Sequence, residues 1–150
     1  MAAHYSNRWQ DWVNLNRQQK KLYLYSLVYL KAISILLHLF RYQDLHKFLK
    51  KRVPLKSNLP SELAISRATK LSGIVESAGR TRLVNASCLR RSLVLWYLLR
   101  REGIESNLCF GVRKVADEII GHAWVEIDGS VINDDQENVE QFVQMNFDGM

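Results

Sequence analysis

The chain has 150 residues, enough for one domain whose core needs no disulfide or metal to hold it together. Its hydrophobic fraction (47%) and charged fraction (24%) are those of a globular protein, which argues against long disordered segments. Two cysteines occur, Cys88 and Cys109, and they form no Cys-x-x-Cys pair. This argues against a disulfide scaffold and a structural zinc site, and it predicts a cytoplasmic protein with free thiols.

The net charge of +6 is concentrated in the first part of the chain. Residues 1–60 hold 11 basic and 2 acidic residues, whereas the remainder has a small acidic excess. Such a basic region can attract an acidic protein, anionic lipid or nucleic acid. No DNA- or RNA-binding motif accompanies the charge, so we expect no nucleic-acid partner.

Residues 17–52 are predicted to be helical. Within them, the apolar run 22–40 is 19 residues long, close to the length that spans a bilayer. Lys31 lies at its middle, where a charge is costly in lipid, so a helix packed against the domain is favoured over a span. Association with a membrane surface is the further alternative. The first 21 residues lack the apolar core of a secretory signal.

Residues 55–60 form the clearest linker, and a helix is predicted from Ser61 to about Ala78. We therefore expect a basic helical region at 1–60 and a core at 61–150, packed together as one compact domain. The next helix is predicted to begin at Asn85 or Ser87 and to end at Gly103, because Asn and Ser cap helix starts and Gly closes helix ends.

After Gly103 the apolar pattern changes to a period of two residues. Residues 104–112 are predicted to be a strand, 113–120 a loop, and 119–134 a hairpin that turns at Asp128-Gly129. The segment 138–147 is ambiguous between helix and strand. Helices followed by a small antiparallel sheet predict an α+β fold.

Cys88 lies in the first turn of a predicted helix. Free amides and the positive end of the helix dipole stabilise a thiolate there and make it a usable nucleophile, and Arg90 and Arg91 would add positive charge nearby. The alternative is that Cys88 is a small core residue.

His122 is predicted near the start of a strand, and an imidazole there could take the thiol proton. A two-residue turn at Asp128-Gly129 would place Asp135 opposite His122, whereas a three-residue loop would bring Asp134 to the same face. Either aspartate could orient the ring. The alternative is a structural histidine beside a solvated strand end.

Trp124 and Glu126 share the predicted face of His122. Trp124 would form a wall of the site or a core contact, and Glu126 a hydrogen-bond acceptor or the exposed end of the strand. Cys109 alternates with apolar residues and is expected in the core. No residues have convincing metal-ligand spacing, so neither a metal nor another cofactor is expected.

Two segments together resemble one family closely. They are Cys88-Leu89-Arg90-Arg91-Ser92 with the leucine-rich helix after it, and His122-Ala123-Trp124-Val125-Glu126 with an acidic residue beyond the turn. With Gly111-Val112 between them, they resemble the leader peptidases of lasso-peptide biosynthesis (the B proteins). That family is a branch of the transglutaminase-like cysteine proteases. The family pattern favours Asp134 as the acidic residue.

The resemblance implies a transglutaminase-like or papain-like core and a catalytic Cys88, His122 and Asp134. The Cys88 amide would stabilise the oxyanion, and Asn85 would supply a second donor. The substrate would be a ribosomally made precursor peptide, whose freed core a separate ATP-dependent cyclase would close.

The first 60 residues leave no room for a fused winged-helix recognition domain, so the chain resembles the stand-alone form, which depends on a separate recognition protein. The basic region could dock that protein, the cyclase or a membrane.

Two other functions compete with the peptidase. One is a transamidase on the same fold, in which an amine replaces water. The other is a non-catalytic adaptor or membrane-associated scaffold, against which the intact Cys88, His122 and Asp134 argue.

Overall fold

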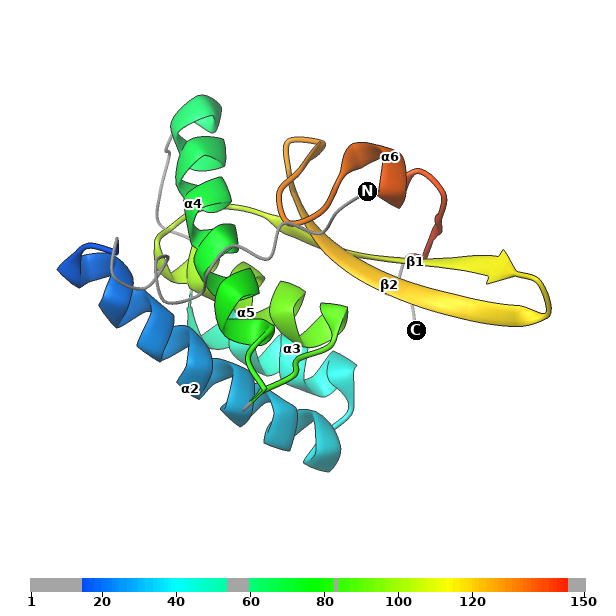
Figure 1. The fold of residues 1–150 in the computed structure, drawn as a ribbon, viewed down its shortest axis with the longest axis horizontal. Coiled ribbons are helices and arrows are strands. Elements are labelled where there is room, and N and C mark those ends of the chain that lie inside the picture. Colours follow the sequence, from blue (N-terminus) through cyan, green and yellow to red (C-terminus); the bar gives the residue numbers. More distant parts are fainter. Residues whose placement is uncertain (1–14, 54–59, 83, 146–150) are drawn as a thin grey trace.

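Helices precede a small sheet along the chain in the computed structural model, which describes residues 15–53, 60–82 and 84–145. The helices are α2 (Arg17–Leu39), α3 (Tyr42–Arg52), α4 (Ser61–Gly79) and α5 (Cys88–Arg101). Strands β1 (Asn107–Val115), β2 (Glu118–Ile127) and β3 (Ser130–Val131) follow, then the short helix α6 (Gln136–Val139) and β4 (Val143–Met145). The predicted α+β order is confirmed (Figure 1).

The predicted helical region 17–52 divides into α2 and α3 around Phe40 and Arg41. Asn16 begins α2 with a capping box, because its side chain accepts from the Gln19 amide and the Gln19 side chain accepts from the Asn16 amide. Leu30 and Ile33 of α2 are buried in the core, which confirms a helix packed against the rest of the domain. The predicted linker at 55–60 lies outside the described residues except for Pro60.

Helix α5 forms the centre of the helical layer. Its residues Leu93, Val94 and Leu95 are almost completely buried, and it packs against α4, α2 and β2. The helix ends near the predicted Gly103, which has a φ of +76°. That left-handed conformation lets the Ile104 amide return to the Leu99 carbonyl at 2.9 Å.

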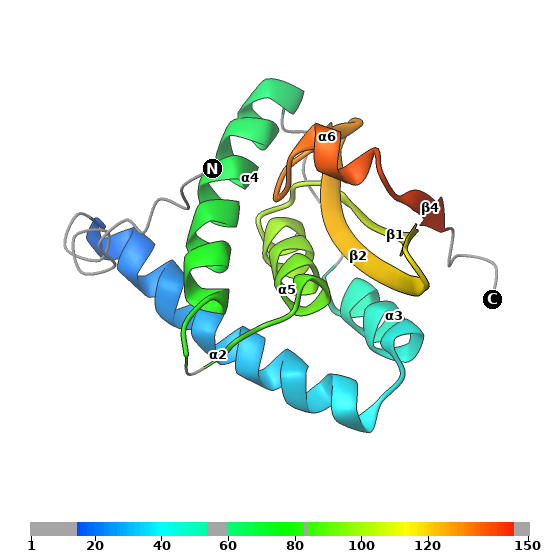
Figure 2. The ribbon, with the colours of Figure 1, turned by 45° about the vertical axis from the view of Figure 1, so that its right-hand side comes forward.

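The antiparallel sheet has the strand order β3-β2-β1-β4. Ala123, Val125 and Ile127 of β2 are buried, and the last two belong to the core cluster that includes α5. Trp124 alternates with them and packs with Cys109 and Val139 in a second, smaller cluster. The sheet thus lies between the long helices and α6, as Figure 2 shows.

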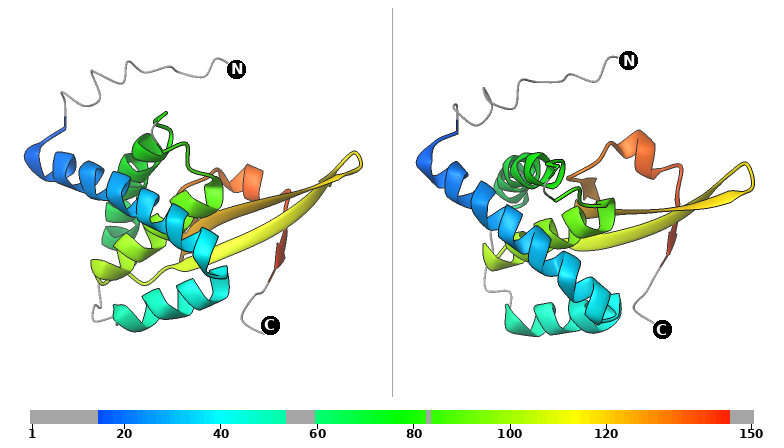
Figure 3. Two further views of the ribbon diagram at one scale, coloured as in Figure 1. Left: turned by 90° about the horizontal axis from the view of Figure 1, so that it is seen from below. Right: turned by 60° about the horizontal axis from the view of Figure 1, so that its bottom comes forward.

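The prediction of a loop at residues 113–120 is wrong. Strand β1 continues to Val115, and β2 begins at Glu118 after the two-residue turn Ala116-Asp117, so His122 lies inside a strand and not near its start. Residues 114–121 are exposed on both faces of the hairpin, which projects beyond the helices (Figures 1 and 3). Because neither face is buried there, the sequence shows no alternation from which these strand ends could be recognised.

Candidate active site

Strand β2 places three side chains on one face of the sheet. His122, Trp124 and Glu126 alternate with the buried residues that face the helices. The Trp124 Nε1–H donates to Glu126 Oε1 at 2.6 Å, so Glu126 holds the indole ring rather than the imidazole. Two of the three predicted residues on this face, Trp124 and Glu126, are therefore hydrogen-bonded to each other.

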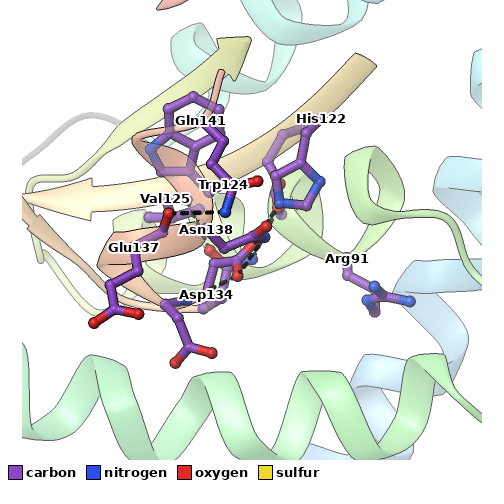
Figure 4. Close-up of polar contacts among 12 residues, drawn as sticks. Arg91, His122, Trp124, Val125, Asp134, Glu137, Asn138 and Gln141 are labelled. Carbon is purple, nitrogen blue, oxygen red and sulfur yellow. Dashed lines mark hydrogen bonds and ion pairs between the residues drawn. The ribbon is translucent and has the colours of Figure 1, made fainter. Parts of the chain in front are cut away.

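The carboxylate of Asp134 contacts His122. Its Oδ2 accepts from the ring Nε2, and both side chains are mostly buried. Figure 4 shows the imidazole and the carboxylate facing each other. An ionised carboxylate can only accept, so Nε2 carries the proton and Nδ1 remains as the acceptor of the neutral ring. No hydrogen bond to Nδ1 occurs within the described part of the chain.

The turn before Asp134 has two residues, since Ile127 pairs with Ser130. Both Asp128 and Gly129 have positive φ, as the type I′ turn of an Asp-Gly hairpin requires. The expectation that such a turn selects Asp135 is wrong, because strand pairing ends at Val131 and the chain leaves the sheet. Asp135 is exposed at the start of α6, whereas Asp134 reaches the ring.

Asn138, which lies in α6, donates hydrogen bonds to the Asp134 carboxylate. Its Nδ2 lies 3.0 Å from Oδ1 and 3.1 Å from Oδ2, and the Asp135 amide donates to Oδ1 at 2.7 Å. Burial raises the pKa of Asp134, but the hydrogen bonds from Asn138, His122 and the Asp135 amide outweigh it, so the pKa is lowered from its ordinary value. The carboxylate is therefore kept ionised.

Two aromatic rings flank the imidazole. The ring centroid of Phe142 lies 5.1 Å from that of His122, and the centroid of Trp124 lies 6.0 Å away in a stacked arrangement. Gly111 pairs with His122 across the ladder, and a Cβ there would lie 2.6 Å from the Cβ of Phe142. The glycine is therefore required by the close approach of Phe142.

Asn138 and Phe142 were not predicted as site residues. Asn138 follows Asp134 by four residues, a spacing that matches neighbouring positions on a helix, but it lay in a segment whose structure was ambiguous. Phe142 lay in the same segment, which divides into the helical α6 and the strand β4. The four-residue spacing from Asp134, which immediately precedes the N-cap residue of α6, is the signal that could have pointed to Asn138.

A buried network attaches α5 to the edge of the sheet beside His122. Ser92 is fully buried and donates to the Ala123 carbonyl at 2.9 Å. Asn133 donates to the Ser92 hydroxyl at 2.8 Å and accepts from the Val125 amide at 2.8 Å. Helix α5, strand β2 and the segment leading to Asp134 are thereby held in one arrangement.

Cys88 is the first residue of α5 and is partly exposed. It precedes Ser92 by one helical turn, about 6 Å along the axis, and Ser92 bonds the residue next to His122. Ser87 occupies the cap position without a side-chain cap hydrogen bond, so the first-turn amides of α5 are not capped by it. The partly exposed thiol thus shares a helix end with polar N–H groups and lies on the helix that contacts β2 at Ala123.

The start of α5 and the contacts of Arg91 differ in part from what the sequence predicts. Asn85 has a φ of +42° and its amide donates to the Thr81 carbonyl, and the helix begins after Ser87 and not at Asn85. Arg91, expected to add positive charge beside the thiol, pairs with Glu76 at 3.0 Å and donates to the Ala86 carbonyl at 2.7 Å. The Arg91 guanidinium is thereby directed to Glu76 and to the Ala86 carbonyl, and it anchors the segment before the helix.

An open hollow of about 580 Å³ adjoins this helix start. Ser87, Leu89 and Arg90 line one side, and the end of α2 lines the other with Leu39 and Phe40. The mixture of apolar walls and guanidinium groups suits a peptide chain better than a small ion.

Cys109 lies in the smaller core cluster, as predicted. Burial and the neighbouring Glu126 carboxylate raise its pKa to about 12, so this thiol is not a nucleophile at neutral pH. Among the residues that the structure describes, no group of three or more His, Cys, Asp or Glu side chains could hold a metal ion.

Residues 27–146 match the family model of the transglutaminase-like superfamily. Among curated proteins and among solved structures no match was found. The superfamily includes cysteine peptidases and transamidases, and its members are usually cysteine-dependent enzymes.

Proposed function

Because the chain belongs to the transglutaminase-like superfamily, we propose that it is a cysteine peptidase that removes the leader from a ribosomally made lasso-peptide precursor. The observation that carries this proposal is the pairing of His122 with an ionised Asp134 beside the helix that begins at Cys88. A carboxylate on Nε2 leaves Nδ1 as the base for a thiol.

In the proposed reaction, His122 Nδ1 takes the proton of the Cys88 thiol, and the sulfur attacks the scissile carbonyl of the precursor. The uncapped amides at the start of α5, including that of Cys88, stabilise the oxyanion. The C–N bond then breaks, and the imidazolium gives its proton to the leaving amine. Asp134 holds the ring and stabilises its charged form throughout.

Water completes the reaction. His122 removes a proton from the water as the oxygen attacks the thioester carbonyl. The C–S bond then breaks, and the imidazolium returns the proton to the departing Cys88 sulfur. The products are a leader with a free carboxylate and a core peptide with a free amino terminus. A separate ATP-dependent cyclase would join that amino group to a side-chain carboxylate.

The proposed substrate needs a separate recognition protein of winged-helix type to deliver the leader. In this proposal, the recognition protein docks on the basic surface of α3, where three lysines are exposed: Lys47, Lys50 and Lys51. Charge reversal at all three positions should weaken binding of the recognition protein, measured by titration calorimetry. Unchanged binding would reject this surface as the docking site.

The reaction is tested by incubating the wild type, Cys88→Ala and Cys109→Ala with precursor and recognition protein, and by analysing the products by mass spectrometry. We expect cleavage by the wild type and by Cys109→Ala, which loses only the buried thiol, and none by Cys88→Ala. Cleavage by Cys88→Ala would eliminate Cys88 as the nucleophile.

Mass spectrometry also separates hydrolysis from transamidation, since only hydrolysis yields a free leader carboxylate. A leader joined to an amine would show a transamidase on the same site. Absence of cleavage by the folded wild type with its partners would favour the non-catalytic adaptor.

A further inference from the structure

The outer side of α2 carries a row of exposed apolar side chains. Leu24, Val28, Ile35 and Leu39 are between 53% and 71% exposed. At 100° per residue they fall within one narrow sector of the helix, opposite the buried Leu30 and Ile33. In the left view of Figure 3, α2 crosses in front of α4 and α5, and no described element covers its outer side.

This row is long and narrow. Helix α2 has 23 residues and is about 34 Å long, and the four side chains extend over most of it. Scattered exposed leucines are ordinary on a protein surface, but four exposed apolar side chains aligned on one face of a helix mark an interaction site. A helix lying flat on a bilayer presents such a row.

The charge around the row is uniformly basic. Residues 17–41 contain Arg17, Lys20, Lys21, Lys31 and Arg41 and no Asp or Glu. Basic side chains are attracted to anionic lipid headgroups near the membrane surface. These basic residues lie at the two ends of the apolar run and at its middle, so their charge complements an anionic membrane surface.

Lys31 lies within the row, between Val28 and Ile35. A lysine there opposes a transmembrane span, but a helix in the plane of the interface lets its long side chain extend to the headgroups while its neighbours enter the acyl region. The helix is long and apolar enough to cross a membrane. Its other face, however, is committed to the core through Leu30 and Ile33.

We propose that the outer face of α2 binds the surface of a membrane that contains anionic lipid. The apolar row enters the interface, and the flanking lysines and arginines contact headgroup phosphates. Since the end of α2 lines the hollow beside the start of α5, this orientation brings Cys88 close to the bilayer. The binding requires no peptidase activity, so it can fail or succeed independently of the proposed reaction.

The test is co-sedimentation of the full chain with vesicles of phosphatidylcholine, with or without phosphatidylglycerol. The variant Val28→Gln/Ile35→Gln removes two apolar contacts and keeps residues that favour a helix. Its control, Ile119→Gln/Val143→Gln, makes the same kind of change at positions that are 76% and 72% exposed on the hairpin and on β4. Circular dichroism verifies that both variants are folded.

We expect the wild type to bind the mixed vesicles at least about tenfold more tightly than pure phosphatidylcholine, and salt to weaken the binding. The α2 variant should lose about tenfold or more in affinity, whereas the control should match the wild type. Three results would overturn the proposal: a wild type that stays unbound, equal losses in both variants, or an α2 variant that binds as the wild type does. An α2 variant that keeps vesicle binding but loses the recognition protein would assign the row to a protein partner.

Discussion

The electrostatics of the site depend on the carboxylate of Asp134. It receives hydrogen bonds from His122, from Asn138 and from the Asp135 amide, and these lower its pKa in spite of burial. Because the pKa is depressed in the folded state, the ionised form contributes stability at neutral pH. That contribution is lost as the pH falls below about 4, the ordinary pKa of an aspartate, and through the folded value.

Asn138→Ala should shift the acid limit of the proposed activity. Loss of the amide donor raises the pKa of Asp134, so the carboxylate protonates at higher pH and the acid limb of the pH–rate profile moves upward. Peptide cleavage measured across the acid range checks this. Gln136→Ala, at an exposed position on the same short helix, is the control, and an acid limb unchanged in Asn138→Ala would contradict the positioning role of Asn138.

Gly111→Ala should destabilise the protein by about 1–3 kcal/mol, because its Cβ would lie 2.6 Å from Phe142 Cβ. Relief of this clash moves Phe142 away from the His122 ring, so the proposed activity should fall as well. Gly121→Ala is the matched control, since a Cβ there has no atom within 4 Å. Urea unfolding measures both variants, and equal stabilities would show that Phe142 does not require the glycine.

At the scale of elements, the attachment of α5 to β2 decides where the first turn of α5 lies relative to the histidine. The attachment is polar and fully buried at Ser92, whose hydroxyl both donates to Ala123 and accepts from Asn133. A buried hydroxyl with both roles satisfied orients two elements more specifically than apolar contact alone.

Ser92→Ala should cost about 1–3 kcal/mol, since it leaves the Asn133 amide and the Ala123 carbonyl without their buried partner. The proposed activity should fall by more than the folded fraction does, because the start of α5 is no longer held against β2. Ser34→Ala, which removes a hydroxyl bonded only within α2, is the control. A Ser92→Ala protein with wild-type activity and stability would refute this role.

In the whole molecule, the residues that stabilise the fold and the residues of the candidate site lie on opposite faces of the sheet. The large core lies on the face toward α5, whereas the site rests on the smaller cluster beneath α6. Leu93→Ala, in the large core, should cost about 2–5 kcal/mol, whereas Phe142→Ala should cost less and reduce the proposed activity more. Chemical unfolding and peptide cleavage measured on both variants check this division, and the reverse ranking would disprove it.

Local rules accounted for much of the fold. The end of α5 near Gly103 and the hairpin turn at Asp128-Gly129 depend on backbone conformation within a few residues, and the start of α5 follows Ser87, one of the two predicted cap residues. These interactions join residues that are close in sequence, so the residues themselves predict them. The division of the chain at residue 60 stays a prediction.

By itself, the sequence determined that Cys88 lies in the first turn of a helix and that His122 lies on a strand before a tight turn. Both follow from cap residues, turn residues and apolar periodicity that are close together in the chain. Only the tertiary structure decided between Asp134 and Asp135, since the choice depends on where the chain leaves the sheet after Val131. It also brought Asn138 to the Asp134 carboxylate and Phe142 to the imidazole, because α6 and the residues after it pack on the sheet. Such contacts join segments whose own sequence patterns are ambiguous, so no local rule could have identified the contacting residues.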